Sequence, residues 1–203
     1  MINFEGSVIK SIYLGEAKIK KIYLGRNLIY PGYTNAEWIT LSANLDTGIR
    51  VGSNTEIECR FSRDNTSSYL YRSDSSSSGS TNLTAYLATS NGAASNGNWR
   101  FGAERIAFIT PVNTWITSKQ NRHEVLFDGT RKGSYENVTT FTSTNNLIIT
   151  PTHTKLKYIK VYNYATSELI ADFIAVKEIS SGHFGLLDKI SGVFYGNENN
   201  TGN

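Results

Sequence analysis

The chain has 203 residues and a formal net charge of +3 at pH 7, a length that suits one domain with a small addition. Its single cysteine excludes an intramolecular disulfide. The first residues lack a basic segment followed by an apolar one, and no stretch approaches the roughly 20 apolar residues of a membrane helix. We therefore expect no secretory signal, no membrane insertion and folding in a reducing cytosol.

The basic excess is concentrated at the start of the chain. Residues 1–32 carry five basic and two acidic side chains, while the rest of the chain is balanced. This density is far below that of a nucleic-acid-binding surface. We expect no nucleic-acid partner.

Residues 1–32 also contain a ten-residue repeat, in which Ile-Tyr-Leu-Gly occurs at 12–15 and again at 22–25. A glycine and a short polar break after each copy predict a three-stranded meander with tight turns. The apolar side chains lie on both faces of this small sheet, so the rest of the chain or other subunits must cover it. The residues that we expect to mediate docking and oligomerisation are Ile12, Tyr13, Leu14, Ile22, Tyr23 and Leu24.

Beyond Pro31-Gly32, residues 33–203 form a second unit whose composition favours strands. Short alternating segments recur, with turn signals every eight to twelve residues. The expected strands include 37–41, 56–61, 67–72, 83–87, 99–101, 105–109, 115–117, 123–127, 138–141 and 147–150. Asp128-Gly129 predicts a hairpin turn, and the polar stretches 73–82 and 89–98 predict loops. A dozen such strands indicate an all-β, two-sheet sandwich.

The last fifty residues carry the clearest strand patterns. Residues 155–162 alternate polar and apolar side chains, which predicts a half-buried strand. A turn at 165–167 leads to 168–176, where the apolar run is nearly continuous. Such a strand is usually covered on both faces, so we expect it in the middle of a sheet.

Three strings here resemble the closing strands of concanavalin A-like (LamG-like) jelly-roll modules, which occur in proteins of bacteriophages and gut bacteria. They are Asp172-Phe173-Ile174, Gly185-Leu186-Leu187-Asp188-Lys189 and Val193-Phe194-Tyr195. Residues 45–49 and 53–58 are similar to the first strands of the module, so the resemblance brackets residues 36–203 and is specific at its two ends. Ala175 stands where the module has proline, and Leu187 where it has tyrosine. The Ile-Tyr-Leu-Gly repeat resembles the leader of phage virion proteins.

This resemblance implies a jelly-roll domain over 33–203 in a non-enzymatic structural protein of a phage virion, a fibre or decoration subunit of the head or tail. Residues 1–32 would then dock onto other virion proteins and form a homo-oligomer, a trimer as is usual for phage fibres. The protein would assemble in the host cytoplasm, and its lectin-like domain would face host-surface glycans. A carbohydrate-binding module of a bacterial protein is the alternative, and a glycoside hydrolase is a third reading.

The sequence offers little for catalysis or metal binding. Retaining glycosidases need two carboxyl groups about 5 Å apart, and Glu56 and Glu58 are the only pair on one strand face. They alternate with Ile57, Cys59 and Phe61, so we expect the carboxylates outside, the thiol buried and no catalysis. The three histidines lack metal-ligand spacing. The aspartates near the polar loops form no recognisable calcium loop, so we expect no metal and no cofactor.

Sugar binding is the more plausible chemistry, because rings stack on apolar sugar faces while polar loop residues bind hydroxyls. The two polar loops flank Tyr86, and other aromatic residues lie nearby in the sequence. The candidate residues for carbohydrate binding are Tyr69, Tyr71, Tyr86, Trp99 and Arg100. The competing interpretation is that the tryptophans at 38, 99 and 115 belong to the core.

Overall fold

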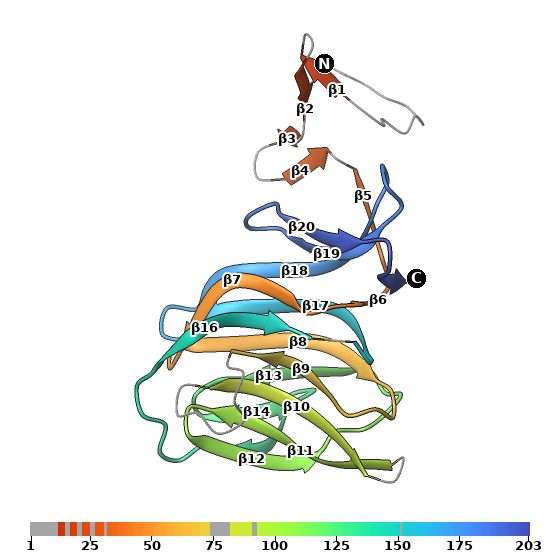
Figure 1. Cartoon of the computed structure of the whole chain (residues 1–203). Helices are drawn as coiled ribbons and strands as arrows, with labels where there is room; N and C mark the ends of the chain where they lie inside the picture. The colour runs from red at the N-terminus through yellow and green to blue at the C-terminus, as the bar shows by residue number, and fades with distance from the viewer. Residues whose placement is uncertain are drawn as a thin grey trace.

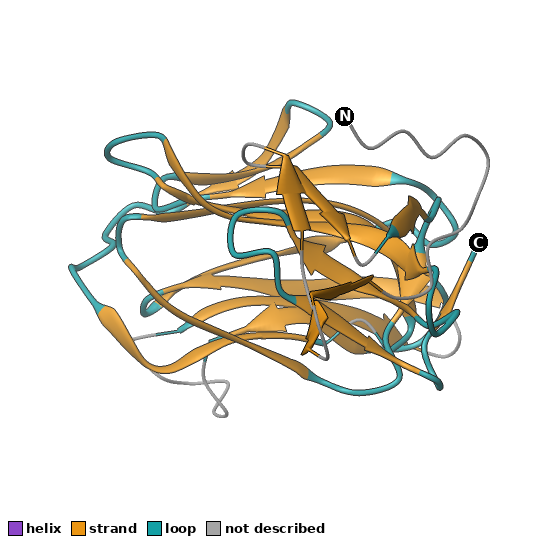
Figure 2. Cartoon of the chain, turned by 90° about the horizontal axis from the view of Figure 1, so that it is seen from above, coloured by secondary structure: helices purple, strands orange, loops and turns teal. Residues whose placement is uncertain are grey.

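The computed structural model describes residues 12–14, 17–19, 22–24, 27–30, 32–73, 82–90, 93–150 and 152–203, the first four ranges as backbone only. Every regular element in these ranges is a β-strand. The strands from residue 33 onward form two antiparallel sheets that pack face to face (Figures 1 and 2). The all-β sandwich predicted from the sequence is confirmed, and it is consistent with a jelly roll.

One sheet has six strands in the spatial order β12-β11-β10-β9-β16-β7. Their bounds are β7 Leu45–Gly52, β9 Ser68–Arg72, β10 Leu83–Ser90, β11 Ala93–Phe101, β12 Glu104–Ile109 and β16 Thr142–Ile149. Four of these strands, β9 to β12, form a continuous antiparallel meander (Figure 1). The sheet is therefore built largely from local hairpins.

The other sheet has eleven strands, eight of them in the order β15-β14-β13-β8-β17-β18-β19-β20. Their bounds are β8 Thr55–Arg63, β13 Ile116–Gln120, β14 Glu124–Phe127, β15 Thr130–Ser134, β17 Thr154–Asn163, β18 Glu168–Glu178, β19 Phe184–Asp188 and β20 Phe194–Asn197. Three short strands join this sheet beside the main path: β5 Tyr33–Asn35, β6 Ile39–Thr40 and β21 Thr201–Gly202. As expected, the apolar strand β18 lies inside the sheet, between β17 and β19.

The N-terminal repeat forms two separate hairpins instead of one three-stranded meander. In one, β1 (Ile12–Leu14) pairs with β2 (Ala17–Ile19), and in the other β3 (Ile22–Leu24) pairs with β4 (Asn27–Tyr30). The prediction of tight turns after Leu14 and Leu24 agrees with these strand ends. The side chains that we expect to mediate docking lie outside what the structure describes.

Two other strand boundaries differ from the sequence prediction. The stretch 89–98 is mostly paired, since β10 runs to Ser90 and β11 starts at Ala93, and residues 91 and 92 lie outside the described ranges. Asn96, Gly97 and Asn98 lie within β11, and the register of its ladder with β10 shifts between Tyr86 and Ala88. Residues 138–141 are not a strand, and β16 starts at Thr142. The Asp128-Gly129 turn is confirmed, with both residues at positive φ (47° and 79°).

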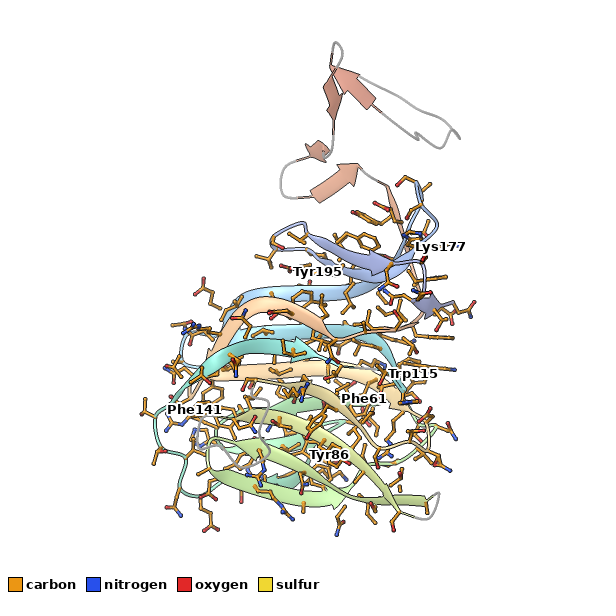
Figure 3. The ribbon with its side chains drawn as sticks, viewed as in Figure 1. Phe61, Tyr86, Trp115, Phe141, Lys177 and Tyr195 are labelled. Atoms are coloured by element: carbon orange, nitrogen blue, oxygen red, sulfur yellow. The ribbon has the colours of Figure 1, made fainter. Side chains whose placement is uncertain are left out.

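The core between the sheets is centred on Trp99, which is fully buried. Its ring contacts Tyr71, Phe108 and Phe127, with centroids 6.2, 5.7 and 5.4 Å away. Phe61 of β8, labelled in Figure 3, is also fully buried, and its ring packs against that of Phe127 with the centroids 6.3 Å apart. This aromatic cluster explains why the alternating residues of β8 and β11 must face inward.

Cys59 is a packing residue, as predicted. Its thiol is fully buried and lies 3.0 Å from the hydroxyl of Ser118 on β13. Burial raises the pKa of Cys59 from its ordinary value of 9.0 to about 12. The thiol therefore stays protonated and inert at neutral pH.

One buried polar residue, Gln120 at the end of β13, connects the two sheets. Its amide nitrogen donates to the carbonyl oxygen of Arg100 (2.8 Å) and to the hydroxyl of Tyr135 (2.7 Å). Its amide oxygen accepts from the hydroxyl of Tyr71 on β9 (2.7 Å). Burial raises the pKa values of both phenols, so both stay neutral, with Tyr71 donating to the amide oxygen and Tyr135 accepting from the amide nitrogen.

Replacing Gln120 with leucine should lower the free energy of unfolding by about 3 kcal/mol, because the hydroxyls of Tyr71 and Tyr135 lose buried partners. Chemical denaturation followed by tryptophan fluorescence measures this loss. Adding Tyr71→Phe should restore part of it, since that change removes one orphaned hydroxyl. An unchanged unfolding midpoint in Gln120→Leu would contradict the role assigned to the amide.

Candidate functional site

The outer face of the six-stranded sheet carries two of the tyrosines predicted to bind sugar. Tyr69 of β9 and Tyr86 of β10 are register partners, half-buried, with ring centroids 4.9 Å apart (Tyr86 is labelled in Figure 3). Their rings are tilted by 51° to each other. This pair forms an aromatic surface on that face.

Two other predicted residues cannot contact a ligand, because Tyr71 and Trp99 have no exposed surface. A strict alternation along β9 would place Tyr69 and Tyr71 on the same face. The structure has a bulge at Leu70: Tyr71 pairs with Ala85 while Tyr69 pairs with the next residue, Tyr86. The extra residue turns Tyr71 into the core. For Trp99, the core interpretation is confirmed.

Arg100, the fifth predicted residue, lies on the outer face but in the row next to the tyrosines. Register pairing places six residues in one row across the sheet: Asp46, Ile148, Arg72, Thr84, Arg100 and Arg105. Arg100 is directly opposite Arg105, a like-charge pairing that destabilises a sheet. We call Arg72, Arg100 and Arg105 the arginine row.

The arginine row and the tyrosine pair are in contact. The guanidinium carbon of Arg72 lies 5.2 Å from the centre of the Tyr69 ring, a cation–π geometry. The next residue along the tyrosine row is Asn98 of β11, the register partner of Tyr86. The face therefore combines aromatic rings, guanidinium groups and an amide, which can bind the ring faces and the polar groups of a sugar.

A groove of about 350 Å³ continues this face beyond Arg72. It lies over β7, the end of β9 and β16. Its lining residues are Asp46, Arg50, Arg72, Ser73, Thr144, Asn145, Asn146 and Ile148. Asp46 is its one acidic residue, and one of its carboxylate oxygens accepts the backbone N–H of Gly48 (2.9 Å). The sequence analysis missed this groove, because β7 and β16 meet only through long-range pairing.

The two polar stretches do not form a single tip. Since β9, β10 and β11 are consecutive antiparallel strands, the connection before β10 and the turn after it lie at opposite ends of the sheet. Most residues of the first connection lie outside the described ranges. Tyr86 is in the middle of β10, on the sheet face and not at either end.

The carboxylates of Glu56 and Glu58 lie on the opposite side of the molecule, on the outer face of the eleven-stranded sheet. This orientation was predicted, and Ile57 between them is fully buried. The ammonium group of Lys119 lies 3.2 Å from Glu56 and 3.7 Å from Glu58. Burial alone would lower the pKa of Lys119, but the hydrogen bond with Glu56 and the two negative charges raise it.

Neutral donors complete the environment of this carboxylate pair. The side-chain amide of Asn121 donates to Glu56 and the hydroxyl of Tyr158 donates to Glu58, both at 3.0 Å. Burial and the hydrogen bond to Glu58 raise the pKa of Tyr158 to about 12. Both carboxylates thus have protein partners on the surface of the eleven-stranded sheet.

The histidines are dispersed as the sequence indicated. His153 lies 3.4 Å from Asp64, and the His123 ring lies 5.4 Å from that of Tyr164. Within the described ranges, no three His, Cys, Asp or Glu side chains are grouped as a metal site. No helix in these ranges could cross a membrane.

Trp38 and Trp115, which the core interpretation placed inside, are half-buried at the surface of the eleven-stranded sheet (Trp115 is labelled in Figure 3). The ammonium groups of Lys155 and Lys157 lie 4.4 and 4.7 Å from their ring centres. These lysines already cover part of the rings. The two tryptophans are therefore weaker sugar platforms than the tyrosine pair.

Comparisons of the chain with protein-family models, curated proteins and solved structures find no match. The functional argument therefore rests on the geometry described above.

Replacing Glu56 and Glu58 together with glutamine should not remove any enzymatic activity, because neither carboxylate is presented to a substrate. The double variant should lose about 1 kcal/mol per ion pair in stability, since Lys119 keeps hydrogen-bond partners but loses its counter-charges. Reducing-sugar release from a panel of polysaccharides and chemical denaturation measure the two effects. Cleavage by the native chain that disappears in the variant would overturn this assignment.

Proposed function

We propose that the chain is a non-enzymatic structural subunit of a bacteriophage virion, whose β-sandwich binds host-surface glycans through the outer face of the six-stranded sheet. The observation that carries the glycan-binding part is the Tyr69–Tyr86 pair beside the arginine row and the adjoining groove. Exposed aromatic rings with fixed polar groups around them are typical of sugar-binding surfaces.

The virion part of the proposal is supported by the sequence resemblance and by the organisation of the chain. The strands of the N-terminal repeat pair with one another, while β5 pairs with β18 of the sandwich. A separate, apolar and basic N-terminal piece suits docking onto other virion proteins and self-association as a trimer. In this proposal the protein functions on the particle, after assembly in the host cytoplasm and release by lysis.

A carbohydrate-binding module of a bacterial protein is the second candidate. The same sugar-binding face would serve it, and residues 1–32 would then be only a connector. The two candidates differ in the role of the N-terminal repeat. A glycoside hydrolase is less well supported, because Lys119 and neutral donors occupy the one carboxylate pair.

The double variant Tyr69→Ala, Tyr86→Ala should bind at least tenfold more weakly to any bacterial polysaccharide that the native chain retains in a binding array. The loss follows from the removal of both rings from the face, and tenfold corresponds to about 1.4 kcal/mol. A matched control is Tyr162→Ala, Tyr164→Ala, which removes one tyrosine near the end of β17 and one at the start of the turn that follows it, on the other sheet. Equal weakening in the control, or full binding in the first variant, would contradict this location.

A chain that starts at Tyr33 should be monomeric by light scattering, while the full chain should be an oligomer. The reason is the apolar surface of residues 1–32, where burying each large side chain contributes about 1.5–3 kcal/mol. Circular dichroism checks that the shortened chain keeps its strands. A full chain that stays monomeric at high concentration would favour the connector role, and an unfolded shortened chain would show that the repeat belongs to the sandwich.

A further inference from the structure

We propose that the glycan held by the six-stranded sheet is acidic, with sugars that carry carboxylate or phosphate groups. The arginine row binds these anionic groups, and the rings of Tyr69 and Tyr86 pack against the sugars. This inference rests on the proposed glycan binding at this face and adds the charge of the ligand.

The first argument is that the arginines of this face form no ion pair within the described residues. The ion pairs among the described residues lie elsewhere. They connect β8 with β13, β14 with β15, the loop residues His153 and Asp64, and Lys189 with Asp172 of β18. None involves a strand of the six-stranded sheet. Arg105 is exposed, while Arg72 and Arg100 are half-buried.

The second argument is the arrangement of the positive charges. Arg100 and Arg105 are register partners on adjacent strands, and Thr84 alone separates Arg100 from Arg72 in the row. Adjacent strands are about 4.8 Å apart, so the three guanidinium groups start from backbone positions within about 15 Å. Such a row repels itself unless anions lie along it. Arg50 adds a fourth positive charge in the adjoining groove.

The kind of cation in the row also points to anionic groups. The outer face of β17 carries lysines, and Lys155, Lys157 and Lys160 each lie over an aromatic ring. The six-stranded face carries arginines instead. A guanidinium group is planar, and its paired N–H donors match both oxygens of a carboxylate or two oxygens of a phosphate. The arginine row is therefore suited to recognising carboxylate and phosphate groups by their geometry, in addition to attracting them by its positive charge.

The test compares ligands that share a backbone and differ in charge. The full chain is titrated with polygalacturonate, which carries a carboxylate on each sugar, and with its methyl ester, which carries none. Phosphomannan serves as the phosphate-bearing probe and dextran as a neutral reference. We expect at least tenfold tighter binding of polygalacturonate or phosphomannan than of the methyl ester or dextran, and weaker binding as salt increases.

The variant Arg72→Gln, Arg100→Gln should weaken binding of the acidic polymer at least tenfold, because it removes two anion-binding groups and keeps their apolar stems. The matched control is Arg131→Gln, Lys132→Gln, which removes the same charge from β15 of the other sheet, where both side chains are exposed. The control should bind as the native chain does. Circular dichroism confirms that both variants are folded.

The possible results distinguish a failure of the acidic-ligand proposal from a failure of the glycan-binding proposal. Equal binding of polygalacturonate and its methyl ester, lost on Tyr69→Ala with Tyr86→Ala, would overturn the acidic ligand and leave the proposed function standing. Equal weakening by the two charge variants would show unspecific attraction and overturn the assignment to the arginine row. Binding of none of the four polymers would overturn the inference, and the polysaccharide array then decides the proposed function.

Discussion

The burial of one amide between the two sheets fixes how they face each other. Gln120 reaches Tyr71, Tyr135 and the carbonyl of Arg100 with its three hydrogen bonds, so both sheets contribute to a single buried network. A shift of one residue in either sheet would turn the side chains to the other face and leave these polar groups without partners. The network therefore specifies which side of β9 and β11 is inside and, as a consequence, which side chains are displayed outside.

The same constraint gives the two outer faces different chemistry. On the eleven-stranded sheet, Glu56 and Glu58 share Lys119 as an ion-pair partner and receive hydrogen bonds from neutral donors. On the six-stranded sheet, Arg100 has its backbone carbonyl held by Gln120 while its side chain lies opposite Arg105. The carboxylate pair on one face has its partners within the protein, and on the other face the arginine row forms no ion pair among the described residues and is available to a ligand. We infer that binding belongs to the second face.

The sequence predicted the fold class and most strands, because alternation and turn residues report local geometry. It also predicted the outward Glu56 and Glu58, the buried Cys59 and the Asp128-Gly129 turn. The candidate site was only half predictable. A bulge at Leu70 places Tyr71 on the opposite face from Tyr69, and a bulge has no reliable signal in a single sequence. The groove beside Arg72 depends on the pairing of β7 with β16, which are about a hundred residues apart in the sequence. Local patterns of hydrophobicity and turn residues do not show which distant strands will pair.

Net charge is a poor guide to this surface, and strand pairing explains why. Residues 33–203 carry equal numbers of basic and acidic side chains, which indicates a neutral body. The pairing nevertheless sorts them, with the arginine row on one sheet and the pairs of Lys119 and Arg131 with glutamates on the other. Lysines without an ion pair among the described residues also lie on the eleven-stranded sheet, each of those on β17 over an aromatic ring. The arginine row differs because like charges are register neighbours there, and such a local group of positive charge attracts an anionic surface before contact. The local arrangement of charge, and not its sum, is therefore the electrostatic property that would direct the six-stranded sheet toward an acidic glycan.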